Sequence, residues 1–143
     1  MTMTNPSQLT LVWLHIVGNI VWIGSILAVA AAITGKDGDA KVRGELGLRI
    51  YRLLSVPAFV LSFFAGTARL LMDTKYYLSE HHWMHGKLLF ALVVIGIHHV
   101  VGGRAKKLAR GTVQDAGATA TMAVVLLVSA IVAAFFVIFR VPN

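Results

Sequence analysis

The chain has 143 residues, of which 57% are hydrophobic and only 13% charged, and its net charge at pH 7 is +7. A water-soluble domain of this length needs a polar surface that this composition does not supply, so the sequence is typical of a membrane protein. Cysteine is absent, which excludes disulfides, thiolate metal sites, iron–sulfur clusters and c-type haem attachment. A metal or haem would therefore be bound by nitrogen, oxygen or thioether ligands.

Four apolar runs are long enough for the roughly 20 helical residues of a bilayer span. The alternation of barrel strands is absent, so we predict an all-α membrane protein: one integral domain over residues 1–143, with four transmembrane helices in a bundle. The first run is longer than the ~7–15 apolar residues of a secretory signal and no basic residue precedes it, so we expect it to remain a helix. The helices are expected at residues 8–34, 48–73, 80–104 and 116–140.

Basic residues gather after the first and the third apolar run. The positive-inside rule predicts that both segments lie in the cytoplasm, which puts both termini and the 73–82 loop on the outer side. Because this topology accounts for the positive charge, anionic lipid headgroups are expected near these segments and nucleic acid is not expected as a partner. The residues are Lys36, Lys41, Arg43, Arg49 and Arg52 after the first run, and Arg104, Lys106, Lys107 and Arg110 after the third.

Polar side chains mark one face of the first predicted helix. His15, Asn19 and Trp22 follow one another at helical spacing, so they share a face that should point into the bundle. An ionisable group at this depth is costly enough to favour a functional role. His15 is therefore a candidate haem ligand or proton carrier, and a histidine that only joins two helices by hydrogen bonds is the alternative.

The second predicted helix follows a polar segment at 35–47, which we interpret as a solvated loop. Small and polar residues, among them Ser62 and Gly66, repeat at three or four positions and indicate close helix packing. Pro57 is expected to kink the helix. Arg69, near its outer end, either extends to the membrane interface or binds a carboxylate with its planar guanidinium group.

Five of the six histidines lie in or beside the third apolar run. His81 and His82 at its start are interpreted as residues of a wet loop and first turn, which need no function. Lys87 either reaches to the interface with its ammonium group or has a function.

The spacing of the other three histidines separates them. His85 and His99 would lie ~21 Å apart along a helix axis, so they cannot bind one metal ion. His98 lies on a different side of the same helix. The helix therefore presents polar groups on more than one side, and it needs protein or cofactor there.

Topology and depth together place four of these residues near one membrane face. Two imidazoles, from His15 and His85, with the cations Arg69 and Lys87 nearby, are the groups that hold a b-type haem: nitrogens for the iron and cations for the propionates. The same groups could bind a tetrapyrrole substrate, and two histidines could also bind copper or zinc.

One segment is similar to a known family. Trp83-Met84-His85-Gly86-Lys87-Leu88, followed by His98, resembles the Trp-x-His-x-Lys-Leu…His segment of the HemJ-type protoporphyrinogen IX oxidases, small membrane proteins of bacterial haem synthesis. Leu14-His15-Ile16 with Trp22, and the stretch from Tyr51 to Ala58 that contains Pro57, also resemble parts of this family. The resemblance covers roughly residues 11–108.

This resemblance implies an enzyme of the bacterial cytoplasmic membrane that binds haem b. It would oxidise protoporphyrinogen IX to protoporphyrin IX and pass electrons to a membrane quinone or the respiratory chain. The residues expected at the haem are His15, His85, Asn19 and Trp22, with His15 and His85 on the iron and His99 as an alternative; those expected in catalysis are Arg69, Lys87 and His98.

The sequence departs from the family at the end of the first helix. The family usually has a basic residue and a histidine there, whereas residues 28–33 are all apolar. This bears on the catalytic activity more than on the haem site. A haem protein that only relays electrons is therefore one alternative.

Copper is the second alternative. The segment Val21-Trp22-Ile23-Gly24 is similar to the CopD-type copper-resistance membrane domain. A protein of this type would bind a soft Cu(I) ion with its histidines, with or without a thioether from Met72 or Met84. A bundle whose histidines only pair helices is the third. The last apolar run carries no candidate chemistry and is a candidate subunit interface.

Overall fold

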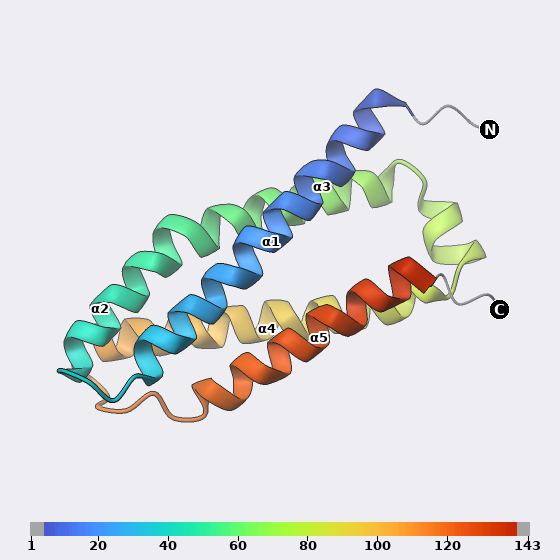
Figure 1. The fold of residues 1–143 in the computed structure, drawn as a ribbon. Helices are drawn as coiled ribbons and strands as arrows, with labels where there is room; N and C mark the ends of the chain where they lie inside the picture. The colour runs from blue at the N-terminus through green and yellow to red at the C-terminus, as the bar shows by residue number, and fades with distance from the viewer. Residues whose placement is uncertain (1–4, 140–143) are drawn as a thin grey trace.

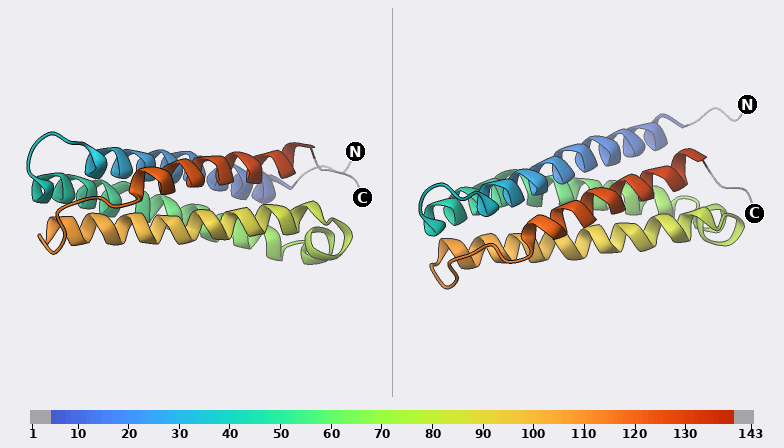
Figure 2. Two further views of the ribbon diagram at one scale, coloured as in Figure 1. Left: turned by 90° about the horizontal axis from the view of Figure 1, so that it is seen from below. Right: turned by 60° about the horizontal axis from the view of Figure 1, so that its bottom comes forward.

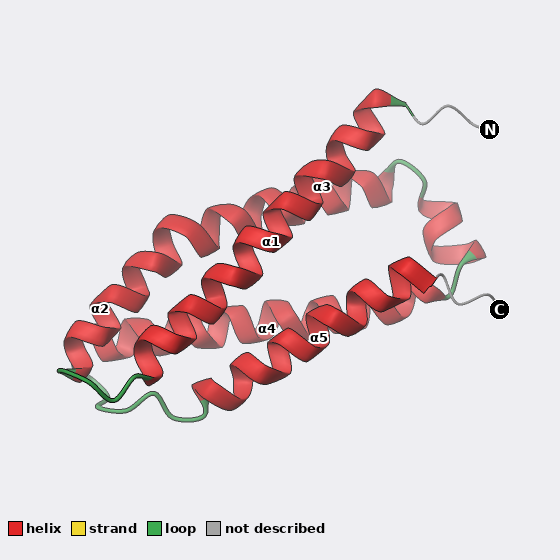
Figure 3. Cartoon of the chain, in the orientation of Figure 1, coloured by secondary structure: helices red, strands yellow, loops and turns green. Residues whose placement is uncertain are grey.

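The computed structural model describes residues 5–139 of the chain, and every regular element in this range is a helix (Figure 3). Four helical rods are long and apolar enough to cross a membrane. This confirms the predicted all-α class with four candidate membrane-spanning helices. The first rod is α1 (Pro6–Thr34). The second is a continuous series of α2 (Ala40–Ile50), η1 (Tyr51–Ser55) and α3 (Val56–Leu71). The third is α4 (Trp83–Ala109), preceded by a short helical turn η2 (Tyr76–Glu80), and the fourth is α5 (Thr119–Phe139).

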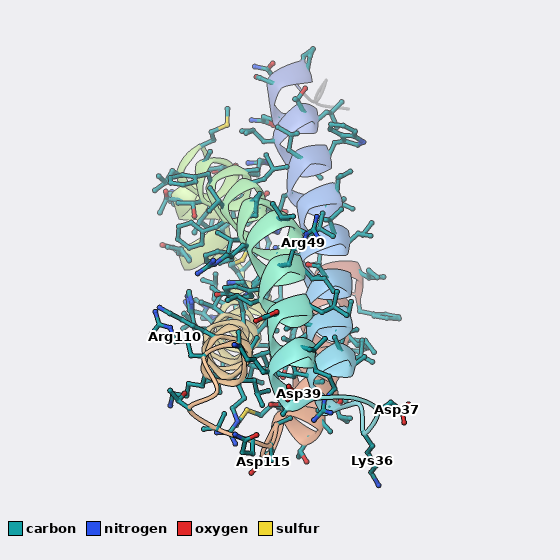
Figure 4. All side chains as sticks on the ribbon, turned by 90° about the vertical axis from the view of Figure 1, so that its left-hand side faces the viewer. Lys36, Asp37, Asp39, Arg49, Arg110 and Asp115 are labelled. Atoms are coloured by element: carbon teal, nitrogen blue, oxygen red, sulfur yellow. The ribbon has the colours of Figure 1, made fainter. Side chains whose placement is uncertain are left out.

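The rods run alternately in opposite directions, as short connections require (Figure 1). The start of α1, the end of α5 and the segment 72–82 lie at one end of the bundle, which we call the terminal end. The connections 35–39 and 110–118 lie at the other, which we call the basic end. Figure 4 looks onto the basic end, where Lys36 and Arg110 extend away from the helices. The predicted end of the last helix at residue 140 lies outside the described residues.

The predicted solvated loop at 35–47 is mostly helix. Helix α2 begins at Ala40 rather than at residue 48, with Asp39 as its N-cap: the Asp39 carboxylate accepts a hydrogen bond of 3.0 Å from the Lys41 backbone N–H. Gly44, which looks like a loop residue in the sequence, is buried against α4. A Cβ atom added there would collide with the backbone nitrogen of Ala109. Glycine in this segment therefore serves close helix packing.

Pro57 does not end the second rod. A turn of π-helix, in which the Val56 N–H donates to the Tyr51 carbonyl, lies directly before it. Proline lacks an N–H group and its ring collides with the carbonyl four residues earlier, and a widened turn accommodates both effects. This π-turn brings the ring of Tyr51 against Gly102 of α4, where an added Cβ would collide with the ring.

The tightest packing lies toward the basic end, where α1, α2 and α4 meet. Fully buried apolar side chains line this region: Val29, Ile33, Val101, Ala105 and Leu108. Toward the terminal end, the pair α1 and α3 diverges from the pair α4 and α5 (Figures 1 and 2). Helix α4 packs closely on α2 but has few close contacts with α3. The terminal half, where His15, Arg69 and Lys87 lie, is therefore the less tightly packed half.

The connection at 110–118 is held by one ion pair. Arg104 donates from Nη2 to the Asp115 carboxylate at 2.7 Å and from Nε to the Asp115 carbonyl at 3.0 Å. The Gly117 N–H donates to the same carboxylate at 2.7 Å. The Gly117 hydrogen bond, and next the Arg104 guanidinium, lower the pKa of Asp115 below its ordinary value of 3.8.

We expect this connection to loosen in acid. Because the pKa of Asp115 is lower in the folded state, its carboxylate stabilises the loop above pH 3.8, and this contribution is lost as the pH falls through the lower folded value. Hydrogen exchange should show the protection of the Gly117 amide falling below about pH 3.8 in the wild type. In Asp115→Ala, which has no side-chain acceptor, protection should already be low at neutral pH and should change little with acid. Protection that is equal in both proteins at neutral pH would contradict this prediction.

Candidate functional site

His15 is anchored between α1 and α3. Its Nδ1 lies 2.8 Å from the backbone carbonyl of Ser62, an acceptor, so Nδ1 carries the proton and donates. Its Nε2 accepts from the Asn19 side-chain amide at 3.1 Å. The Ser62 hydroxyl in turn donates to the Asn19 carbonyl oxygen at 2.8 Å. The network defines one tautomer and one ring orientation for His15.

Two glycines make room for this network. A Cβ atom added to Gly18 would lie 2.9 Å from the backbone of Ser62, and one added to Gly66 would lie 2.6 Å from Nδ1 of His15. Both helices can therefore approach closely enough for the imidazole of one to reach the backbone of the other. Three small side chains of the second predicted helix are buried in α3: Ala58, Ser62 and Ala65.

Two cations lie in the same half of the bundle. Lys87 lies near the start of α4, which begins at the terminal end. Arg69, in the last turn of α3, has a buried Nη1 without a hydrogen-bond partner, and its guanidinium lies 5.1 Å from the ring centroid of Tyr77.

Neither cation has an acidic partner among the residues that the structure describes. Over residues 5–139 the ion pairs are Lys75 with Glu80 and Arg104 with Asp115. Cations at membrane depth normally pair with an acidic group, so the half-buried Arg69 and Lys87 are suited to an anionic ligand.

His98 belongs to a different cluster, in the centre of the bundle. The Trp22 indole N–H donates to His98 Nδ1 at 3.0 Å, so Nδ1 is unprotonated and the neutral ring carries its proton on Nε2. Nε2 lies 3.2 Å from the Tyr51 hydroxyl and donates to it. Phe59 stacks on the imidazole with a centroid distance of 5.0 Å.

This cluster changes the interpretation of two predicted site residues. His98 is 1% exposed, and it could accept a proton only by giving up the hydrogen bond from Trp22. Its contacts join α1, η1 and α4 and give it a packing role, and the catalytic role stays a prediction. Trp22, predicted beside the haem, hydrogen-bonds in this cluster and not to His15.

His85 and His99 are both exposed. The imidazole of His85, predicted to act with His15, lies beside that of His82, with ring centroids 5.8 Å apart. His99 packs edge-on against His98 at 4.9 Å. Asn19 therefore contacts His15 from one turn along the same helix, whereas His85 is exposed on α4.

Between residues 5 and 139, no three His, Cys, Asp or Glu side chains come together. Met84 is buried at 5% exposure whereas Met72 is 49% exposed, so the two thioethers do not share one environment.

Sequence reasoning missed the partners of the histidines. His15 and Ser62 are 47 positions apart, as are Tyr51 and His98. Periodicity places a residue on a helix face but does not say which residue of another helix it meets. The one available signal was the run of small residues around Ser62, which indicated close packing.

Comparisons with protein-family models, with curated proteins and with solved structures find no match to this chain. The function is therefore inferred from the site residues and from the similarity of short segments.

Proposed function

We propose that this chain binds haem b and oxidises protoporphyrinogen IX to protoporphyrin IX, as the family that its segments resemble does. One observation carries the proposal: an anchored imidazole, His15, lies in the same half of the bundle as two cations, Arg69 and Lys87, that have no acidic partner among the described residues. A porphyrin needs an axial nitrogen for its metal and positive charge for its carboxylates.

The residues present fit such a group. A metal-binding histidine usually donates from its other ring nitrogen to a carbonyl, and His15 does so from Nδ1 to Ser62. Its Nε2 is partnered by the Asn19 amide, which would have to turn away for the nitrogen to bind iron. The buried Nη1 of Arg69, which lacks a partner, fits a propionate oxygen.

The haem, when bound, would supply one-electron redox chemistry. Arg69 and Lys87 would bind and orient the carboxylates of a tetrapyrrole. Ser62 would keep His15 in one tautomer. His85 is the second proposed haem contact, and electrons would pass to a membrane quinone.

We further propose the predicted orientation in a bacterial cytoplasmic membrane, with the basic end in the cytoplasm and both termini outside. The support is the concentration of Lys and Arg at the end that carries the 35–39 and 110–118 connections. Under this topology, His15, Arg69 and Lys87 belong to the outer half.

The first test is the visible spectrum of the detergent-purified protein, with haem added and then reduced by dithionite. We expect a Soret band and sharp reduced α and β bands. His15→Ala should lose them, whereas Asn19→Ala should bind haem at least as tightly as the wild type, because it frees Nε2. A protein that stays colourless with haem, or a His15→Ala variant with an unchanged spectrum, would overturn the proposal, and a copper titration would follow.

The role of the cations has its own control. Arg69→Gln and Lys87→Gln should each weaken haem binding roughly tenfold, as expected for one charge-assisted contact of ~1.4 kcal/mol. Neither should affect binding of the dimethyl ester of haem, which lacks the carboxylates. Lys75→Gln is the matched control, because Lys75 is exposed and lies near Glu80. Turnover of protoporphyrinogen with quinone then separates an oxidase from a haem protein that only relays electrons.

A further inference from the structure

A groove of about 360 Å³ lies between α4 and α5 at the basic end. Val100, Gly103 and Lys107 line it from α4, the 116–118 segment and Met122 line it from the other side, and its walls are mostly apolar. Gly103 leaves it open, because a Cβ atom added there would meet nothing within 4 Å. The groove is separate from the His15 site, so a ligand bound in it would be independent of haem.

The groove passes from an apolar to a charged region. Val100 and Lys107 are two helical turns apart, ~10 Å along the axis. Val100 is 51% exposed on a helix long and apolar enough to cross a membrane, whereas Lys107 lies in its last turn. One end of the groove therefore lies at the depth of acyl chains and the other at the depth of headgroups.

The charge at the headgroup end is positive. Asp115 is the acidic residue nearby, and its carboxylate is occupied by Arg104 and by the Gly117 N–H. Lys107 forms no ion pair in the described part of the chain, and Lys106 and Arg110 are exposed beside it. The Arg104–Asp115 pair also holds the 110–118 connection in place as one wall.

We propose that this groove binds an anionic phospholipid of the leaflet at the basic end. The phosphate would lie at Lys107, and an acyl chain would follow Val100, Gly103 and Met122. A free phosphate or a nucleotide would use the cation but not the apolar walls, which make up most of the groove. A zwitterionic lipid would use the walls but would gain less from Lys107.

The test is native mass spectrometry of delipidated protein in detergent, with phosphatidylglycerol or phosphatidylcholine added. The wild type should retain phosphatidylglycerol about fivefold better, the factor that corresponds to ~1 kcal/mol for one cation at an anionic surface. Gly103→Leu should fill the groove and lose both lipids. Lys107→Gln should keep the phosphatidylcholine level and lose the preference for phosphatidylglycerol.

Two matched variants serve as controls. Gly96→Leu also places a side chain where nothing lies within 4 Å, on the same helix but away from the groove, and Lys106→Gln removes an exposed neighbouring charge. Both should behave as the wild type. Equal retention of phosphatidylglycerol in Gly103→Leu and Gly96→Leu, or in Lys107→Gln and Lys106→Gln, would overturn the proposal, as would displacement of the lipid by inorganic phosphate alone. If Gly103→Leu does not fold, the comparison of Lys107→Gln with Lys106→Gln still tests the proposal.

Discussion

Replacing Gly44 with alanine should destabilise the folded bundle by about 2–3 kcal/mol, the cost of overpacking a close contact. The added Cβ would collide with the Ala109 nitrogen and would lie 2.6 Å from the Leu108 carbonyl carbon. Both are backbone atoms of α4, so no side-chain rotation can relieve the collision and α2 must move away. Thermal unfolding in detergent, followed by circular dichroism, measures the effect.

The control is Gly96→Ala. Gly96 is also in a helix, but an added Cβ there meets nothing within 4 Å. Alanine is the better helix former by up to ~1 kcal/mol, so this variant should be as stable as the wild type or more stable. If Gly44→Ala unfolds at the same temperature as Gly96→Ala, the result would contradict the close packing of α2 on α4.

Replacing His98 with leucine should cost about 2–4 kcal/mol, because it leaves one buried polar group without a partner, at ~1–3 kcal/mol, and removes the hydrogen bond of a half-buried one, worth ~1 kcal/mol. These are the indole N–H of Trp22 and the hydroxyl of Tyr51. His99→Leu is the matched control: it changes the next residue on the same helix, which is exposed, and should cost less than ~0.5 kcal/mol.

A double-mutant cycle separates packing from chemistry at His98. Tyr51→Phe removes one partner, so combining it with His98→Leu should cost less than the sum of the two single changes. His98→Leu protein that is still folded should bind haem like the wild type. If the His98→Leu and His99→Leu variants are equally stable and only His98→Leu loses turnover, the packing role is contradicted and the catalytic role predicted for His98 is supported.

The role of a glycine cannot be assigned from the sequence alone. Gly44 and Gly47 lie in a segment rich in charged residues and looked like parts of a loop, yet both are buried in α2. Loops and close helix contacts both favour glycine, and only the position of a second helix distinguishes them. The predicted helix start at residue 48 was late for this reason.

The pattern of apolar and basic residues was enough to predict the four rods, their alternating directions and the concentration of positive charge at one end. These features follow from the requirement that a chain in a lipid bilayer satisfy its backbone polar groups within each helix, and from the cost of placing charge in lipid. Only the packing of the rods shows that His15 meets Ser62, that His98 lies between Trp22 and Tyr51, and that His85 is exposed. Such contacts join residues 47 or 76 positions apart, and they depend on how the rods pack against one another, which the periodicity of a single helix does not specify.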